Sequence, residues 1–343
     1  MKNAKRIKKR STMEDVAQMA GVTIGTVSHV INGTATISAA TTARVKEAIE
    51  KLNYIPNVAA QNMRRKENRQ LGLLVPKLTN MFYSEMANAI MGEADKEHYT
   101  MMICGYEYSL EQEKKVLYNL LQNNVKTIII ANGHDDEEYI RELIGQGVHV
   151  ILADRRSSEK GVSYVAYNNV VTAEKIVGFL KERGYERIGF ISEPLVLNNL
   201  WDRFVGYKAG LEKYGYSYRE EYVHISEKFR HGHAKNGYFY MKKLLKDHKR
   251  EELPSVFMVS SDMLAIGVIK AIGEAGYRIP EDFGIIACDN LEISAYLQPP
   301  LTTIKQDQMR LAQELWKQVT AYRTGKRVKN IMLEQELVVR DSC

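Results

Sequence analysis

Three short segments near the N-terminus carry apolar residues at helical spacing. They span about 13–20, 24–32 and 39–52, and the apolar positions of each segment fall on one face. Gly21 separates the first two segments, and a glycine that accepts the left-handed conformation is typical of a helix end. The pattern predicts two helices joined by a tight turn and supported by a third. Such an arrangement can hold the second helix in a major groove of DNA, although ordinary helical bundles share it.

Hydroxyl side chains stand where these helices are expected to begin. Thr12, with Asp15 three residues later, is an acidic variant of the capping box. Thr23 and Ser38 are the expected N-caps of the second and third helices. Capping and periodicity therefore predict the same helices.

Beyond residue 70 the pattern changes to short apolar runs that alternate with helical stretches. The first series of runs comprises LGLLVPK, MMICGY, TIIIAN and VHVILAD. A second series begins near Val165 and comprises VAYN, RIGFIS, YVHIS, SVFMVS and FGIIACD. Strands that alternate with helices at this spacing predict parallel sheets covered by helices on both faces. We therefore expect two doubly wound α/β lobes with a cleft between them.

The positive charge is concentrated at the N-terminus. The whole chain carries 48 basic and 42 acidic residues, a net charge of +6. Residues 1–70 contain 13 of the basic and 5 of the acidic residues, a net charge of +8, so the remainder carries −2. This distribution suits an N-terminal domain that binds a polyanion such as DNA.

The sequence lacks the signals that mark several classes of protein. Cys104, Cys288 and Cys343 show neither a disulfide framework nor a CxxC metal spacing. No apolar run is long enough to cross a membrane, and the basic N-terminus lacks the apolar segment of a signal peptide, so we expect a cytoplasmic protein without membrane contact. The motifs GxGxxG after the first strand, GxxxxGK[ST] and GxSxG are absent. We therefore expect no enzyme activity, no catalytic or metal-binding residues and no cofactor.

The N-terminal segment resembles a known family of regulators. Between residues 15 and 64 the chain reads DVAQMAGVT, TVSHVIN, TARVKEAIEKLNYIPN and AAQNMR. These motifs are similar to the DNA-binding domain of the lactose/galactose repressor (LacI/GalR) family. The resemblance implies that base edges are faced by Ile24, Gly25 and His29. It implies that phosphates are contacted, or the contacts oriented, by Thr23, Thr26, Ser28 and Asn32.

The chemistry of these side chains agrees with those roles. Hydroxyl groups can donate to phosphate oxygens, which positions a protein on DNA without reading its sequence. Ile24 can touch a thymine methyl group, and His29 can donate to a guanine edge or accept from a base amine. Gly25 has no side chain, so this protein reads less at that position than a relative with a polar residue. A solvated surface histidine is the alternative interpretation of His29.

A second DNA-reading segment is expected after residue 56. Pro56 and Asn57 predict a turn, and Asn57 can cap a short helix that runs to Met63 or Arg64. In the family this hinge helix forms on DNA, enters the minor groove and inserts an apolar side chain, usually leucine, between base pairs. Met63 holds that position here and can still open a base step. Gln61 stands where arginine is common in the family. The alternative to a hinge helix is that this segment is only a linker.

The rest of the chain resembles the effector domain of the same family. The similar motifs are NMFYSEMANAI, ILADRR, RFVGYKAGL, SSDMLAIGVIKAIGEAGYRIPEDFGIIACDN and PPLTTIKQD. That domain is similar to periplasmic sugar-binding proteins, and its effector positions correspond to Asn132, Asp154, Arg203, Ser261 and Asp289. These residues also fall where ligands of parallel sheets bind, beyond the carboxyl ends of the strands.

Aromatic side chains extend this candidate site. Phe82 and Trp201 can stack on a sugar ring, with ordinary packing as the alternative. Ser261 stands where many sugar-responsive relatives have asparagine, so one hydrogen bond to the effector differs. Asp262 follows a strand and is expected to cap the next helix.

Pattern and resemblance together predict an all-α helix-turn-helix head followed by an α/β, periplasmic-binding-protein-like sensor of two doubly wound lobes. The expected parts are a basic tail over 1–11, a helix-turn-helix domain over 12–56, a hinge helix and linker over 57–70, and an effector-binding and dimerisation domain over 71–341. Because the last segments are expected to return to the first lobe and then to the second, the first lobe is placed at 71–167 and 291–323, and the second at 168–290 and 324–341.

The predicted function is sequence-specific regulation of transcription, with repression of carbohydrate-utilisation genes as the expected role. The expected partners are double-stranded operator DNA, a second copy of the chain, and a small effector that is a sugar or sugar phosphate. The sequence has no leucine heptads after its last strand, so we expect a homodimer rather than an assembly of four chains. A nucleobase corepressor, a phosphocarrier partner protein and a sugar-binding module without DNA function remain as alternatives.

The wedge role of Met63 is testable by substitution. Met63→Asp places a charge between stacked bases, so we expect operator affinity to fall about tenfold or more in a gel-shift titration. Met63→Leu introduces the residue usual in the family and is expected to bind at least as well as wild type. Equal affinity of the Asp variant and wild type would contradict the wedge role.

Overall fold

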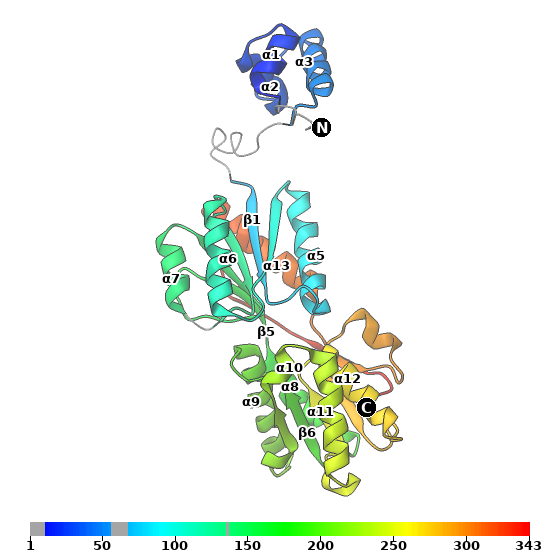
Figure 1. The fold of residues 1–343 in the computed structure, drawn as a ribbon. Coiled ribbons are helices and arrows are strands. Elements are labelled where there is room, and N and C mark those ends of the chain that lie inside the picture. Colours follow the sequence, from blue (N-terminus) through cyan, green and yellow to red (C-terminus); the bar gives the residue numbers. More distant parts are fainter. Residues whose placement is uncertain (1–10, 56–67, 135–136) are drawn as a thin grey trace, which may run out of the picture. The chain divides into compact units, whose positions relative to one another are not determined.

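The computed structural model describes residues 11–55, 68–134 and 137–343 (Figure 1). These residues belong to two compact units that divide between residues 68 and 69. The predicted tail up to residue 10 and the predicted hinge helix lie outside the described residues. Within the described part, no helix is long and apolar enough to cross a membrane.

The described residues of the first unit form the predicted helices, α1 (Met13–Ala20), α2 (Ile24–Asn32) and α3 (Ala39–Leu52). The capping box is confirmed, because the Thr12 hydroxyl accepts from the Asp15 N–H at 3.2 Å and the Asp15 carboxylate accepts from the Thr12 N–H at 2.7 Å. Gly21 ends α1 in the left-handed conformation, with φ of 63°. The three helices pack around a small core that includes Val16, Val27 and Val45.

The first lobe of the sensor is built on a parallel sheet with the strand order β11-β5-β4-β3-β1-β2. Its strands are β1 (Gln70–Val75), β2 (Thr100–Gly105), β3 (Thr127–Ala131), β4 (His149–Ala153), β5 (Ser163–Tyr167) and β11 (Ile331–Leu333). Its helices are α5 (Met81–Lys96), α6 (Leu110–Gln122), α7 (Glu137–Gly145) and α13 (Gln308–Arg323).

The second lobe repeats this plan with the order β12-β10-β9-β8-β6-β7, in which only β12 runs antiparallel, to β10. Its strands are β6 (Ile188–Ser192), β7 (Val223–Ile225), β8 (Val256–Val259), β9 (Gly284–Asp289), β10 (Thr302–Lys305) and β12 (Glu336–Val338). Its helices are α8 (Asn169–Glu182), α9 (Asn198–Lys213), α10 (Glu227–Arg230), α11 (His233–Asp247) and α12 (Asp262–Glu274). Short 3-10 turns are η1 (Glu220–Tyr222), η2 (Arg250–Glu252) and η3 (Glu292–Tyr296).

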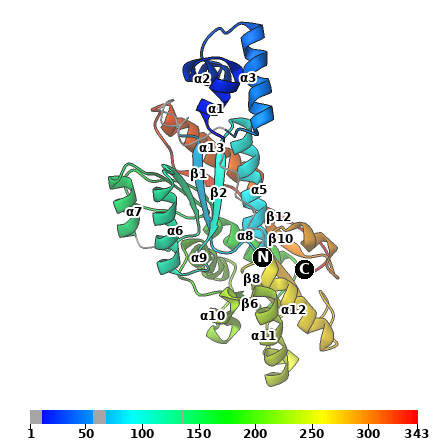
Figure 2. The same cartoon turned by 45° about the horizontal axis from the view of Figure 1, so that its top comes forward.

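Each sheet is buried on both faces, as the continuous apolar runs predict. In β3, Ile129 packs in the core under α5 and α13, whereas Ile128 and Ile130 pack in the core under α6 and α7. In β8, Phe257 faces α11 and α12, whereas Met258 faces α8 and α9. Figure 2 shows α11 and α12 side by side along one face of the second sheet.

The chain crosses between the lobes differently from the expected division. The segment 291–323 was expected in the first lobe, but β10 within it pairs with β9 in the second sheet, and only α13 returns to pack on α5, β4 and β5. The final apolar segment also divides, because β11 pairs in the first sheet and β12 in the second. A short apolar strand carries no local signal of which sheet it joins, so long-range pairing decided its place.

Close packing of α11 on α12 depends on glycine at their contact. A Cβ atom at Gly267 would overlap the carbonyl oxygen of Ala234 and would lie 2.6 Å from the amide nitrogen of Tyr238. A Cβ atom at Gly237 would lie 2.6 Å from the carbonyl oxygen of Leu264. The backbones of the two helices therefore approach closely where one of them carries a glycine.

Substitution of Gly267 tests this contact. Gly267→Ala forces the two helices apart, and we expect the free energy of unfolding to fall by about 3 kcal/mol. Gly273→Ala in the same helix is the matched control, because nothing lies within 4 Å of its Cβ position and alanine favours a helix by about 1 kcal/mol. Thermal melts should show a lower melting temperature for Gly267→Ala only. Equal melting temperatures of the two variants would contradict the close-packing argument.

Candidate functional site

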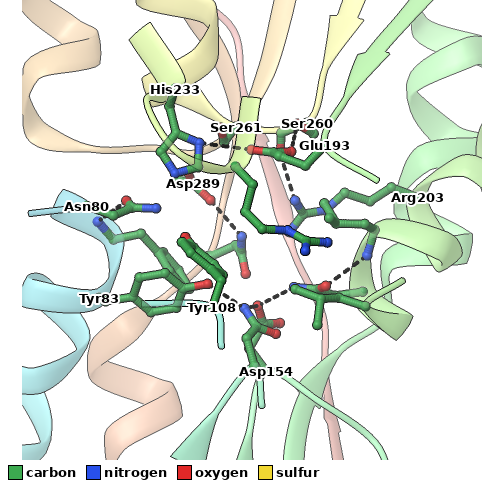
Figure 3. Close-up of a pocket in the computed structure, with 17 residues that line it drawn as sticks. Asn80, Tyr83, Tyr108, Asp154, Glu193, Arg203, His233, Ser260, Ser261 and Asp289 are labelled. Carbon is green, nitrogen blue, oxygen red and sulfur yellow. Dashed lines mark hydrogen bonds and ion pairs between the residues drawn. The ribbon is translucent and has the colours of Figure 1, made fainter. Parts of the chain in front are cut away.

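A cleft lies between the two lobes, where the carboxyl ends of both sheets meet, and its empty space is about 500 Å³ when the solvent at its mouth is included (Figure 3). The first lobe contributes Asn80, Phe82, Tyr83, Tyr108, Asn132 and Asp154. The second lobe contributes residues of α9 and of its strand ends. They include Asn199, Arg203, Ser260, Ser261 and Asp289.

The structure brings together six of the seven residues predicted to bind an effector. Phe82, Asn132, Asp154, Arg203, Ser261 and Asp289 all line the cleft. Trp201 is the exception, because 52% of it is exposed and its indole ring packs beside Phe204 on the outside of α9. Trp201 and Arg203 are two residues apart on one helix, so they point in different directions, and the predicted stacking by Trp201 is wrong for this arrangement.

Asp154 is the centre of a hydrogen-bonded group at the first sheet. Its Oδ2 atom accepts from Nδ2 of Asn199 at 2.8 Å and from Nδ2 of Asn132 at 3.4 Å. Asn132 also donates to the hydroxyl of Tyr83 at 2.9 Å. Burial raises the pKa of Asp154 to about 6, although the charge of Arg203 and the hydrogen bonds from the two asparagines oppose the rise. Because Asn199 belongs to the second lobe, this carboxylate also joins the lobes.

Asp289 forms the corresponding group at the second sheet. Its Oδ1 atom accepts from Nε2 of Gln306 at 2.8 Å. Burial and the neighbouring charge of Asp262 raise the pKa of Asp289 well above its usual value, and the charge of Arg203 opposes the rise. The guanidinium of Arg203 is held by Asn169 and by the carbonyl oxygen of Ser260, at 3.0 and 2.7 Å. Arg203 is therefore fixed between the two acidic groups.

A third acidic group was missed by the sequence argument. Glu193, directly after β6, pairs with His233 at 3.0 Å between Oε1 and Nδ1 and accepts a hydrogen bond from Ser260. Burial favours the neutral acid, but the hydrogen bonds and charge of His233, together with the Ser260 hydroxyl, lower the pKa of Glu193 to about 2. The rule that ligands bind beyond strand ends would have included Glu193, whereas no local signal directs His233 into the cleft.

The N-cap of α12 differs from the expected one. The Ser261 hydroxyl, rather than Asp262, caps α12 by accepting from the Leu264 N–H at 3.3 Å. The fully buried Asp262 carboxylate instead accepts from Thr303, from the Leu291 N–H at 3.0 Å and from Ser294 at 2.6 Å. The expected cap by Asp262 is therefore wrong, because its side chain points toward segments that follow β9 in the chain.

The lobes are also joined beside the cleft. Arg156, after β4, donates to both carboxylate oxygens of Asp202 in α9, at 2.7 and 2.8 Å. The Asn198 side chain accepts from the Arg156 N–H at 3.2 Å and donates to the Arg156 carbonyl at 3.0 Å. These contacts between Arg156 and α9 form an interlobe clamp that fixes the distance between the walls of the cleft.

The head exposes one end of α2. Thr23, Ile24, Gly25 and His29 are exposed, and the Thr23 hydroxyl caps the helix by accepting from the Thr26 N–H at 3.2 Å. Nδ1 of His29 lies 2.9 Å from the Thr34 hydroxyl. Two further predicted DNA contacts, Ser28 and Asn32, bond each other within the helix, through Nδ2 of Asn32 and the carbonyl of Ser28 at 2.7 Å. The predicted contacts Asn57 and Met63 lie outside the described residues.

The chain is similar to bacterial transcriptional regulators along almost its whole length. Residues 12–57 match the family described as bacterial regulatory proteins, lacI family, and residues 177–343 match a periplasmic binding protein-like domain. The HTH-type transcriptional regulator MalR of Clostridium butyricum is 31% identical over 340 residues, which cover 96% of this chain and 98% of the relative. A helix-turn-helix head joined to a two-lobed sensor defines a ligand-binding transcription factor. The chain belongs to the lacI family of bacterial regulatory proteins and is a regulator of transcription rather than an enzyme.

Solved structures confirm the predicted fold class. The lac repressor dimer bound to operator and the anti-inducer ONPF superposes with a TM-score of 0.84 at 27% identity, covering 97% of this chain and 99% of that one. A complex of the transcriptional regulator CelR with cellobiose superposes with a TM-score of 0.72 at 25% identity, covering 97% and 100%. The helix-turn-helix head and the two mostly parallel α/β sheets are therefore shared with this family.

The buried carboxyl of Asp154 predicts a dependence of stability on pH. The pKa of Asp154 is higher in the folded than in the unfolded protein, so its contribution to stability is present below about pH 4 and is lost as the pH rises through 6. Asp154→Asn removes this loss, and we expect it to raise the free energy of unfolding of the unliganded protein by about 1–3 kcal/mol at pH 7.5.

Melting temperatures at pH 7.5, 6 and 5 measure this effect. The advantage of Asp154→Asn over wild type should shrink as the pH falls. Asp247→Asn, at an exposed position, is the control and should show no such trend. A Tm difference that is the same at all three values would show that the carboxyl of Asp154 is not the cause.

Proposed function

We propose that this protein is a repressor of carbohydrate-utilisation genes, which binds a near-palindromic operator as a homodimer and responds to a sugar or sugar phosphate in the cleft. The observation that carries the proposal is the cleft itself, where carboxylate, amide and guanidinium groups from both lobes converge beside the interlobe clamp. These groups suit polyols, because each can bond more than one hydroxyl. The complex of CelR with cellobiose supports a carbohydrate ligand.

The head supports operator binding through the exposed end of α2. Ile24 and His29 offer an apolar and a polar group to base edges, and the Thr23 hydroxyl lies beside them for phosphate. Two such helices, one from each protomer, suit half-sites one helical turn apart. The lac repressor dimer bound to operator supports this arrangement for a chain of the same fold. Such a regulator acts in the cytoplasm, where the DNA is.

Ligand and operator are coupled through the angle between the lobes in this proposal. A ligand that bonds Asp154 and Asp289 together holds both walls of the cleft, as the contacts of Arg156 with α9 do. Reorientation of the first lobes in a dimer then favours or disfavours the hinge segment that reads DNA. A coupling of about 1–3 kcal/mol changes operator affinity about 5–150-fold.

Selection of genomic fragments by the purified protein, with and without a sugar panel, tests the proposal. We expect a palindromic site beside carbohydrate genes, and one sugar that changes its affinity. His29→Ala should weaken binding to that site about tenfold while leaving nonspecific binding in place, because base contacts specify and phosphate contacts position. His248→Ala, at an exposed position of the sensor, is the control and should bind as wild type does.

Three outcomes would reject parts of the proposal. Sequence-independent binding would reject an operator-specific regulator and favour a sugar-binding module without DNA function. If only a nucleobase changes the affinity for the operator, the effector is a nucleobase corepressor rather than a sugar. A site that responds only to a phosphocarrier protein would move the control from the cleft to a protein surface.

A further inference from the structure

The wall of the cleft in the second lobe contains a buried pair, Glu193 and His233 (Figure 3). Glu193 follows β6 and His233 begins α11, and their side chains are 8% and 11% exposed. Oε1 of the carboxylate lies 3.0 Å from Nδ1 of the imidazole, and Ser260 donates to Oε2. The family resemblance assigns neither residue to the effector, so the pair adds to the residues that the resemblance implies.

The pair leaves one nitrogen turned toward the cleft without a partner. A carboxylate held by the imidazole and by Ser260 only accepts, so Nδ1 of His233 carries the shared hydrogen. Nε2 of His233 is buried and has no hydrogen-bond partner among the residues that the structure describes. In the neutral imidazole this atom accepts, and in the imidazolium it donates. A hydroxyl group satisfies it in either state, because a hydroxyl both donates and accepts.

Two further buried atoms in the cleft need a donor. Oδ1 of Asp154 and Oε1 of Gln306 are buried and lack hydrogen-bond partners within the described part of the chain. The orientation of the Gln306 amide is set, because its Nε2 atom donates to Asp289 at 2.8 Å. Both residues are 1% exposed and both line the cleft. A ligand must present O–H or N–H groups to these two atoms, so a phosphate dianion does not fit beside them.

The cations of the cleft are already balanced by carboxylates. Arg203 lies in the field of Asp154, Asp289 and Glu193. The guanidinium of Arg230 pairs with Glu227 at 2.9 Å. Among the described lining residues, no arginine or lysine therefore stands without a carboxylate neighbour to receive a phosphate group.

We propose that the effector is an uncharged, unphosphorylated sugar and that the Glu193–His233 pair reads one of its hydroxyl groups. The inference rests on the proposed function, because it takes the cleft to be the effector site. The proposed function allows two ligand classes, sugars and sugar phosphates, and this inference selects the sugars. His233 donates or accepts one hydrogen bond with the sugar, and Glu193 holds the imidazole in the tautomer and orientation for that bond.

Matched pairs of ligands test the class of effector. The full-length protein is titrated by calorimetry with glucose and glucose 6-phosphate, ribose and ribose 5-phosphate, and cellobiose and its 6-phosphate. Thermal melts extend the comparison to a wider panel of sugars and their phosphates. We expect at least one unphosphorylated sugar to bind, and its phosphate to bind at least about tenfold more weakly, because the phosphate meets desolvated carboxylates.

Substitution of the pair tests the subsite with that sugar. His233→Asn and Glu193→Gln are each expected to weaken its binding about tenfold or more, because a hydrogen bond with a buried partner is lost or misdirected. His248→Asn is the matched control outside the cleft and should keep wild-type affinity. Melting curves of the unliganded variants establish that each is folded. If one of them is not folded, His233→Gln is tested in its place.

Deoxy analogues separate a reading role from a structural one. One monodeoxy form of the sugar should bind wild type about tenfold more weakly, and His233→Asn should bind that form and the parent sugar equally. A purely structural His233 would leave the discrimination unchanged. Coupling between one hydroxyl group and one imidazole is the result that supports the proposal.

The outcomes that overturn the inference differ from those that reject the proposed function. Tighter binding of a sugar phosphate overturns the inference and leaves a ligand-responsive regulator in place. Unchanged affinity of the two variants for a bound neutral sugar overturns the role of the pair. Absence of binding by every sugar, with operator affinity also unaffected, rejects the sugar effector and the inference together.

Discussion

Burial of charge where two sheets face each other is the constraint on which the sensor depends. Asp154, Glu193 and Asp289 end or follow strands, and each is less than a tenth exposed. Carboxylates lose their hydration on burial, so hydrogen-bond donors and positive charge must replace it. Arg203 and a set of amide and hydroxyl groups from both lobes supply them. Asp154 of the first lobe gains its hydrogen bond from Asn199 of the second lobe only when the lobes meet.

The same constraint links stability to function. Burial raises the pKa of Asp154 and Asp289, which means that the ionised carboxylates are less stable in the unliganded cleft than in water. A ligand that donates hydrogen bonds relieves this cost, so binding stabilises the arrangement in which the lobes meet. A site built for a ligand thereby reduces the stability of the free protein. The contacts of Arg156 with Asp202 and Asn198 hold the same lobes at the edge of the cleft.

Three chain connections join the lobes and determine how they can move. The chain passes from β5 to α8, returns from β10 to α13, and passes again from β11 to β12. Each lobe keeps its own cores on both faces of its sheet. Rigid lobes joined by short connections move by hinge bending rather than by internal rearrangement. A ligand in the cleft therefore acts on the angle between the lobes.

Patterns along the sequence predict the helices of the head, the alternation of strands and helices, and six residues of the cleft. Helix caps and apolar periodicity are local, and strand ends converge in any parallel sheet. Long-range packing places β10 in the second sheet, turns Trp201 outward and brings His233 to Glu193. The last two residues are 40 positions apart, and contact between them requires that α11 pack beside the end of β6. Side-chain direction on a helix and the choice of sheet for a short strand depend on such long-range packing, which no local pattern records.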